Sequence, residues 1–264
     1  MKRILFSNII LVSILVLTFN SCKKEKPDTE TQSAVDNNIC ESEFTAIMPN
    51  VNSFGIRENG VKSMLPACPA ITIDSSKGWP RILTIDYAAG CTDSIDGKTR
   101  KGQVICKFYS RWNTIPSKVT VTLQNYYVNN INYTADSITI SRDAVNRFTN
   151  IIHKGKCISS AWTLEWASKR STTQTAGIST PSNPNDDVFE FTGNAEGRDR
   201  NGLAYTLVIA TPIVKRSSCQ WIESGKLDLT PNGLATRSVN FGTGTCDNKA
   251  TLIIDGNSFD FTLQ

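Results

Sequence analysis

The sequence predicts an all-β protein, an antiparallel β-sandwich-like stack of roughly a dozen short strands with one short N-terminal helix. Three observations predict this class. Apolar and polar residues alternate with a period of two from residue 67 to the C-terminus. Turn-forming residues separate the alternating runs, and no helical segments lie between them. With 39% hydrophobic residues, the chain has enough apolar side chains for a real core.

The first 21 residues predict a signal peptide and not a fold element. Lys2 and Arg3 precede an apolar run over residues 4–19, and Cys22 follows the small residue Ser21. A plain signal peptide would need no cysteine at this junction. A transmembrane helix needs about 20 apolar residues, which is more than this run supplies. The pattern therefore predicts a bacterial lipoprotein signal, with Cys22 lipidated and placed at the new N-terminus.

The predicted anchor sets the expected location and partners. Each buried methylene contributes about 0.8 kcal/mol, so several chains on Cys22 would hold the protein stably at a membrane. We expect attachment to the bacterial outer membrane, on its periplasmic or its cell-surface side. Removal of Lys2 and Arg3 lowers the net charge from +4 to +2, and this balance gives no electrostatic argument for a nucleic-acid partner.

Two short regions precede the predicted β domain. Residues 22–35 are almost entirely polar and predict a flexible tether. In region 36–66 we expect a short helix followed by a loop. Asp36 or Asn37 would cap the helix, and Pro49 with Asn50 would end it. The residues expected on its apolar face are Ile39, Phe44, Ile47 and Met48.

The β domain is predicted over residues 67–264. Asn129-Asn130 and Asp255-Gly256 each separate two apolar-rich runs and predict tight hairpins. Residues 168–187 are rich in Ser, Thr, Asn and Pro and predict one long polar loop. This loop is also the expected boundary, should the domain consist of two related β halves.

Two segments of the β domain resemble each other. Residues 85–105 and 239–253 both read as a strand, a glycine-containing bend, a cysteine and a second strand, and each has a further cysteine upstream. The parallel spacing predicts the disulfides Cys68–Cys91 and Cys219–Cys246. Such loops would each stabilise the fold by about 3 kcal/mol. The alternative is a chance similarity between Gly/Thr-rich β sequences.

Seven cysteines remain when Cys22 is set aside, so at least one has no partner within the chain. The repeat leaves Cys106–Cys157 as a less certain third pair. Cys40 would then be the free thiol.

Several motifs resemble a group of uncharacterised envelope lipoproteins of Bacteroidota. The resemblance rests on residues 83–91, 96–102, 125–129 and 244–248, and it covers most of the chain after Cys68. It implies a lipid-anchored envelope protein and no particular activity. Surface-directed lipoproteins of such bacteria carry an acidic stretch after the lipidated cysteine, and residues 23–26 match this poorly, so the side of the membrane stays open.

Two acidic clusters are weak candidates for calcium binding. One contains Asp93 and Asp96, and the other contains Asp186 and Asp187. Neither has the spacing of an EF-hand loop, and Asp is common in ordinary turns. We therefore predict no metal and no cofactor.

Candidate catalytic groups are equally sparse. Asp187 with Glu190, or Glu165 with a distant partner, would supply the two carboxylates of a glycoside hydrolase. Cys40 and His153 would supply a nucleophile and a base, although a buried thiol and a surface imidazole explain them better.

We therefore expect a lipid-anchored envelope β protein with a non-catalytic binding or scaffolding role and a glycan or protein ligand. The alternatives are an envelope glycoside hydrolase with two carboxylates, or a fimbrial or assembly subunit that exchanges a strand.

Overall fold

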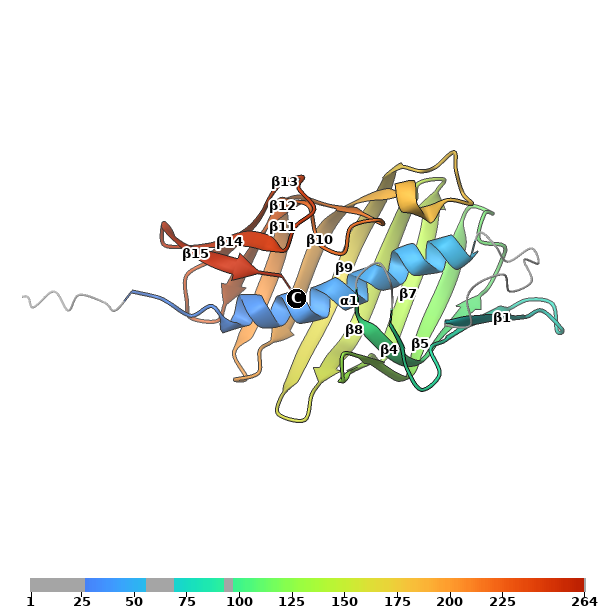
Figure 1. Cartoon of the computed structure of the whole chain (residues 1–264), viewed down its shortest axis with the longest axis horizontal. Coiled ribbons are helices and arrows are strands. Elements are labelled where there is room, and N and C mark those ends of the chain that lie inside the picture. The colour runs from blue at the N-terminus through green and yellow to red at the C-terminus, as the bar shows by residue number, and fades with distance from the viewer. Residues whose placement is uncertain (1–26, 56–68, 93–96, 264) are drawn as a thin grey trace, which may run out of the picture.

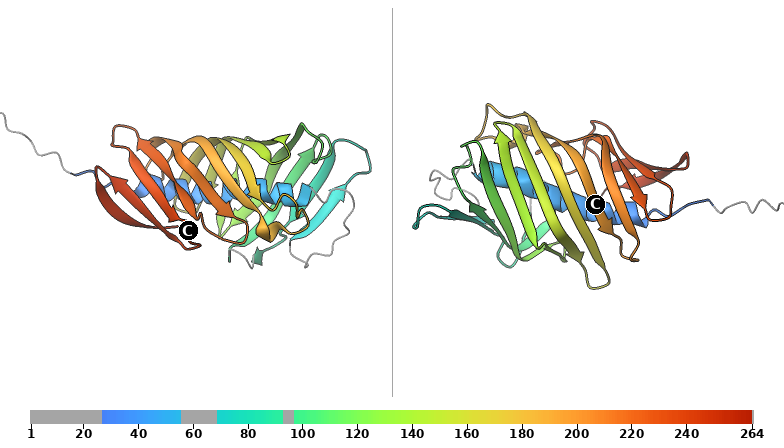
Figure 2. Two further views of the ribbon diagram at one scale, coloured as in Figure 1. Left: turned by 90° about the horizontal axis from the view of Figure 1, so that it is seen from above. Right: turned by 180° about the vertical axis from the view of Figure 1, so that it is seen from behind.

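The computed structural model describes residues 27–55, 69–92 and 97–263. One antiparallel sheet of 15 strands curves around one long helix, α1, which crosses its concave face (Figure 1). Seen from above, the sheet passes on both sides of the helix, and the view from behind shows its outer face (Figure 2). The predicted all-β class with one N-terminal helix is confirmed. The strands, however, belong to one continuous sheet and not to two stacked ones.

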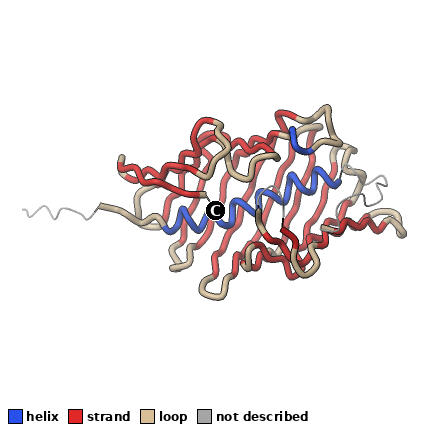
Figure 3. Tube along the Cα trace, in the orientation of Figure 1, coloured by secondary structure: helices blue, strands red, loops and turns tan. Residues whose placement is uncertain are grey.

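The elements follow one another mostly as an antiparallel meander, in which strands close in sequence pair directly. A tube coloured by secondary structure shows the single long helix against this sheet (Figure 3). The helical segments are α1 (Gln32–Gly55) and a 3-10 turn (Pro184–Asp186). The strands are β1 (Ala70–Asp74), β2 (Arg81–Asp86), β3 (Cys91–Thr92), β4 (Thr99–Phe108), β5 (Ser117–Val128), β6 (Ile131–Thr134), β7 (Ser137–Ala144), β8 (Arg147–Ile158), β9 (Thr163–Ala176), β10 (Val188–Arg198), β11 (Ala204–Arg216), β12 (Ser224–Pro231), β13 (Arg237–Thr243), β14 (Lys249–Ile254) and β15 (Asn257–Thr262).

Both predicted hairpins are confirmed. Asn129 and Asn130 connect β5 to β6 with φ angles of 47° and 69°. Asp255 and Gly256 connect β14 to β15 with φ angles of 49° and 79°. A two-residue turn with positive φ at both positions matches the twist of the flanking strands, and Asn, Asp and Gly tolerate it best.

The polar region 168–187 is not one long loop, which corrects our prediction. Its first half belongs to β9, and β9 pairs with β10 along its length, from Glu165 opposite Arg198 to Ala176 opposite Val188. The sheet is therefore continuous at the place where a boundary was expected if the domain consisted of two related halves. The polar residues of β9 that misled the prediction are buried; they are Ser168, Arg170, Thr172 and Gln174.

The helix is longer than predicted at both ends. It begins at Gln32, inside the expected tether, where the Glu30 carboxylate accepts bonds from the Ser33 N–H at 2.7 Å and the Ser33 hydroxyl at 2.8 Å. It then continues through Pro49 to Gly55. None of the α1 side chains that the structure describes is exposed. Packing on all sides outweighs the local penalty of a proline within a helix.

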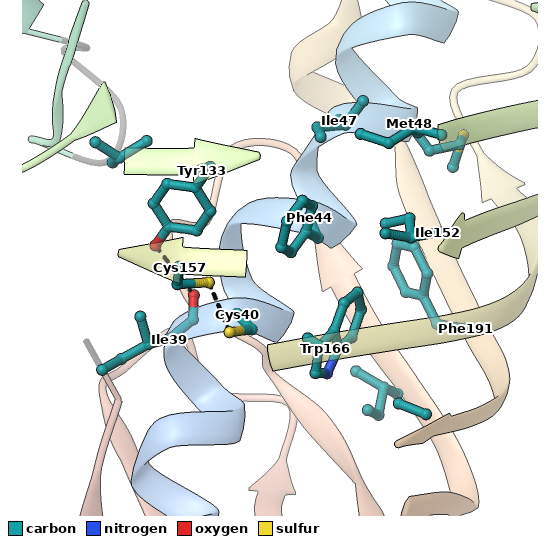
Figure 4. Close-up of a cluster of buried hydrophobic side chains, with 14 of the residues drawn as sticks. Ile39, Cys40, Phe44, Ile47, Met48, Tyr133, Ile152, Cys157, Trp166 and Phe191 are labelled. Atoms are coloured by element: carbon teal, nitrogen blue, oxygen red, sulfur yellow. Dashed lines mark hydrogen bonds between the residues drawn. The ribbon is translucent and has the colours of Figure 1, made fainter. Parts of the chain in front are cut away.

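Aromatic packing seats the helix on the centre of the sheet (Figure 4). The Phe44 ring stacks on Trp166 at 5.3 Å between centroids and meets Tyr133 edge-on at 5.6 Å. Gly155 lies directly under this ring, because a Cβ there would stand 3.0 Å from Phe44 and 2.9 Å from the Trp166 carbonyl oxygen. A glycine in β8 thus lets the helix approach the sheet closely.

The cysteines confirm one predicted pair and correct another. Cys219 and Cys246 form a disulfide with Cα atoms 5.8 Å apart. Cys91 is also disulfide-bonded, whereas Cys68, its predicted partner, and the lipidation site Cys22 lie outside the described residues.

The predicted Cys106–Cys157 pair is wrong. The Cys157 Sγ atom lies 2.6 Å from the Cys40 Sγ atom, so Cys40 is not the isolated thiol. Cys106 is on β4, and β5 and β6 separate that strand from β8, which carries Cys157. Sequence spacing could not show this because Cys40 approaches from the helix and not from a neighbouring strand.

Candidate functional site

The concave face of the sheet binds the N-terminal segment through buried ion pairs. Three arginines of separate strands, together with Arg200 in the turn between β10 and β11, each meet a carboxylate of residues 28–43. The pairs are Arg100–Glu43 at 3.0 Å, Arg170–Glu41, Arg200–Asp36 at 2.5 Å and Arg237–Asp28 at 2.8 Å. A charge removed from water needs a partner of opposite sign, so these pairs fix the position of the helix along the sheet.

Neutral hydrogen bonds complete this contact. The Tyr126 hydroxyl donates to Glu43 at 2.5 Å. Two buried indole N–H groups donate to asparagine side chains of the helix, Trp166 to Asn37 at 3.0 Å and Trp112 to Asn52 at 2.9 Å. The polar groups of the helix are thus largely occupied by the sheet. A candidate ligand site is better sought on the outer face.

A groove of about 830 Å³ runs over the outer face of β8 to β12. That size falls within the range of pockets that hold small ligands, about 300–1,000 Å³. Its charged side chains come from three successive strands, and they are Lys154, Lys156, Glu165, Glu196 and Arg198. The groove therefore combines cations and carboxylates on one surface.

Strand register explains the alternation of charge. Glu165 of β9 lies opposite Lys156 of β8 on one side and opposite Arg198 of β10 on the other. The Glu165 carboxylate is 3.6 Å from the Arg198 guanidinium, and both side chains stay about half exposed. Exposed pairs contribute little to stability, typically about 0–1 kcal/mol, and both charges stay in contact with solvent.

Small and polar side chains form the remainder of the groove. Ala167 lies opposite Glu196, and Ala204 lies opposite Arg198. These small side chains leave space in the groove beside the charged ones. Thr206 of β11 lies opposite Thr230 of β12 and adds hydroxyl groups. Beyond them, the turn after β12 contributes Asn232, Gly233 and Leu234 as a wall.

The carboxylates that sequence analysis singled out are not brought together. Asp187 is buried and accepts a hydrogen bond from Gln174 at 2.8 Å. Burial and, to a smaller extent, the neighbouring Asp186 raise the pKa of Asp187 to about 6, against the opposing hydrogen bond from Gln174. Glu190 lies on β10, three positions after Asp187. Because successive side chains of an extended chain alternate between the two faces, Glu190 faces the opposite side of the sheet from Asp187.

Glu165 does share its groove with a second carboxylate, Glu196, which sequence analysis missed. The two residues are 31 positions apart and become neighbours only through the register of β9 with β10, in which Glu196 lies opposite Ala167. No local motif announces such a pair. The available local signal is the Glu196-Gly197-Arg198 run, in which two charged residues of opposite sign share one face of β10.

The other candidate sites do not assemble. Asp93 and Asp96 lie outside the described residues. Asp186 and Asp187 share a turn, and within the described part of the chain no three His, Cys, Asp or Glu side chains group as metal ligands. Cys40 is buried under the sheet, whereas His153 is exposed, so these two do not form a nucleophile and base.

Comparison with known proteins gives no relatives: no family model, curated sequence or solved structure matches this chain. The resemblance to Bacteroidota lipoproteins therefore stays a prediction. Within the described residues, no helix combines the length and the apolar character needed to span a bilayer.

Proposed function

We propose that this chain is a lipid-anchored envelope protein that binds a glycan in its outer groove without catalysing a reaction. The observation that carries the proposal is the groove itself, in which charged, hydroxyl and amide side chains from five adjacent strands line one polar surface. Cys22 would carry the lipid and hold the protein at the bacterial outer membrane.

The chemistry of the groove suits carbohydrate. Every sugar hydroxyl both donates and accepts hydrogen bonds. Carboxylates only accept, ammonium and guanidinium groups only donate, and Thr and Asn side chains do both. Glu165, Lys156 and Arg198 alternate in this way along one row. Because they remain solvated, binding would be selective in orientation but modest in affinity.

The N-terminal segment supports the anchoring role. Asp28 and Glu30, the first charged residues that the structure describes, both contact the fully buried Arg237 of β13. The chain then enters α1, which the sheet surrounds. A pull on the lipid would therefore act on a helix that packs closely against the sheet and not on a loose strand.

A glycoside hydrolase is the second candidate, and the shared position of Glu165 and Glu196 favours it. The two carboxyl groups are about 5–5.5 Å apart in retaining enzymes and about 6.5–9.5 Å apart in inverting enzymes. One of the two groups is usually shielded from water, so that it keeps its proton. The Glu165 side chain is instead 54% exposed and faces Arg198. This environment suits binding better than proton donation.

Affinity electrophoresis of the detergent-solubilised protein in gels containing envelope polysaccharides would test the groove. Thr206→Trp fills the groove and should abolish retardation. Val208→Trp is the matched control, because Val208 lies on the same face of β11 but does not line the groove. Equal retardation of both variants would contradict the proposal. Release of reducing ends by the wild type, lost in Glu165→Gln, would favour the hydrolase.

Labelling of growing cells with radioactive palmitate would test the anchor. Wild-type protein should incorporate label, and Cys22→Ala should not. Equal incorporation by both proteins would remove Cys22 as the lipidation site.

A further inference from the structure

Two buried cysteines from distant parts of the chain meet beneath the helix. The Cys40 Sγ atom of α1 and the Cys157 Sγ atom of β8 are 2.6 Å apart and point toward one another (Figure 4). Even carbon atoms, which are smaller than sulfur, prefer a non-bonded separation of about 3.5–4.0 Å. Two unlinked sulfur atoms would repel strongly at this spacing, whereas a disulfide needs only about 2.05 Å.

We propose that Cys40 and Cys157 are joined by a disulfide in the mature protein, a modification that fixes the helix covalently to the sheet. Both residues are fully buried. The backbone around them is held independently of the sulfurs, since the Tyr133 hydroxyl donates to the Ile39 carbonyl at 3.3 Å and Phe44 packs against Tyr133. The approach of the two thiols is therefore imposed by well-packed neighbours.

No other described thiol competes for either sulfur. Cys219 and Cys246 are bonded to each other, and Cys91 is already in a disulfide. Cys106 is the remaining free cysteine in the described part of the chain, and it lies on β4, away from β8. Burial raises the pKa of Cys106 to about 12, so it is a poor source of thiolate for exchange.

The reaction is an ordinary thiol–disulfide exchange. One cysteine, as thiolate, attacks a disulfide oxidant and forms a mixed disulfide, and the second cysteine then displaces the reduced oxidant. Cys40 and Cys157 together lose two protons and two electrons, and the oxidant's disulfide becomes two thiols. The oxidant class is a dithiol–disulfide oxidoreductase or a small-molecule disulfide. The Cys219–Cys246 bridge indicates that the fold matures where such oxidants act.

The bond would form before the helix is fully seated. Burial raises the pKa of Cys157 well above that of an ordinary thiol, and the adjacent Cys40 adds to this effect. Once the site is closed, little thiolate is present to attack an oxidant, and the oxidant has no access. The bridge would therefore be made during folding and then be protected.

The position of the bridge gives it a mechanical consequence. It would link residues 117 positions apart and tie the middle of α1 to the centre of the sheet. The ion pairs along the helix would then be supported by a covalent bond, and force applied to the N-terminal segment would not withdraw the helix. This inference does not depend on the proposed glycan binding.

Peptide mapping tests the bridge directly on the full chain, purified in detergent from cells that export it. The protein is denatured with N-ethylmaleimide present and digested with trypsin without reduction. Cleavage at Lys107 and Lys156 places Cys40, Cys106 and Cys157 on separate peptides. We expect a linked Cys40–Cys157 pair and an alkylated Cys106. Alkylated Cys40 and Cys157, or a bond from Cys157 to any other cysteine, would overturn the proposal.

Variants provide a second readout. Cys40→Ser should expose the Cys157 thiol to alkylation in denaturant, whereas Cys106→Ser should leave the Cys40–Cys157 peptide unchanged. The Cys40→Ser/Cys157→Ser double variant should unfold about tenfold faster or more in urea than Cys106→Ser, because the cross-link restrains the helix. Equal unfolding rates would argue against a bridge. If Cys40→Ser does not fold, the wild-type peptide map still decides.

Discussion

Two Glu–Arg pairs, each with one member on β9, show how differently the two faces of this sheet are used. Arg170 of β9 points inward and pairs with Glu41 of the helix, and both side chains are almost fully buried. Glu165, five residues earlier on β9, points outward and lies 3.6 Å from Arg198, with both side chains about half exposed. The chemical groups are identical, and only the surrounding solvent differs.

The difference separates a structural role from the binding role that we propose for the outer face. Inside, each charge has been removed from water, so either partner alone would be strongly unfavourable and the pair specifies where the helix sits. Outside, water competes for both charges and screens them, so the pair adds little stability and its groups stay available. The inner face therefore holds the helix, and the outer face presents the groove.

Breaking the inner pair should have the largest effect. Arg170→Met leaves the Glu41 carboxylate buried without a counter-charge, and we expect a loss of about 3–5 kcal/mol in the free energy of unfolding. Urea denaturation followed by circular dichroism measures it. The Glu41→Met/Arg170→Met double variant should recover most of the loss. A single variant within about 1 kcal/mol of wild type would show that water reaches this pair.

Adjacent tyrosines provide a matched test of the two faces. Tyr126 is buried, and its hydroxyl donates to Glu43 at 2.5 Å. Tyr127 points the other way, and the Lys101 ammonium lies 4.2 Å from the centroid of the Tyr127 ring. Tyr126→Phe should cost about 1.5–3 kcal/mol, because a hydrogen bond to a charged group is lost. Tyr127→Phe keeps its aromatic ring and should stay within about 0.5 kcal/mol of wild type. Equal losses in urea denaturation would contradict the assignment of faces.

The same division explains what the sequence could predict. Where strands face an apolar core, the period of two is visible, and the hairpins at Asn129-Asn130 and Asp255-Gly256 follow from turn chemistry alone. On β9 the inward residues Ser168, Arg170 and Thr172 are polar although buried, and Arg170 pairs with Glu41 of the helix, so the pattern resembled a loop. A polar interior cannot be distinguished from a solvated loop without knowledge of its partner.

The groove and the Cys40–Cys157 contact were hidden for a related reason. The groove exists because Glu165 and Glu196 are brought together by the register between strands, and the thiols meet because the helix crosses the sheet. Both depend on pairings between residues far apart in sequence. The Cys219–Cys246 disulfide was predictable because its two cysteines are only 27 residues apart in the sequence.

Asp187 gives a smaller, pH-dependent contrast. Burial, more than the neighbouring Asp186, raises its pKa in the folded state to about 6 from the ordinary value of 3.8. Between these values the native state holds a proton that the unfolded state has lost, so the free energy of unfolding falls as pH rises through this window. Asp187→Asn should flatten that slope and stabilise the protein at pH 7 by on the order of 1 kcal/mol. Thermal melts from pH 4 to 7 measure it, and parallel slopes for both proteins would refute it.

Breaking the outer pair should have the smallest effect on stability and the clearest effect on the groove. Glu165→Gln removes a charge that water already solvates, so we expect a change of less than about 0.5 kcal/mol in urea denaturation. That small change should vanish in about 1 M salt, where the screening length is about 3 Å. The loss of unfolding free energy in Arg170→Met should persist, because buried charges are screened far less. A large, salt-resistant loss of unfolding free energy in Glu165→Gln would mean that the outer pair has a structural role. That result would contradict the proposal that the groove binds a ligand.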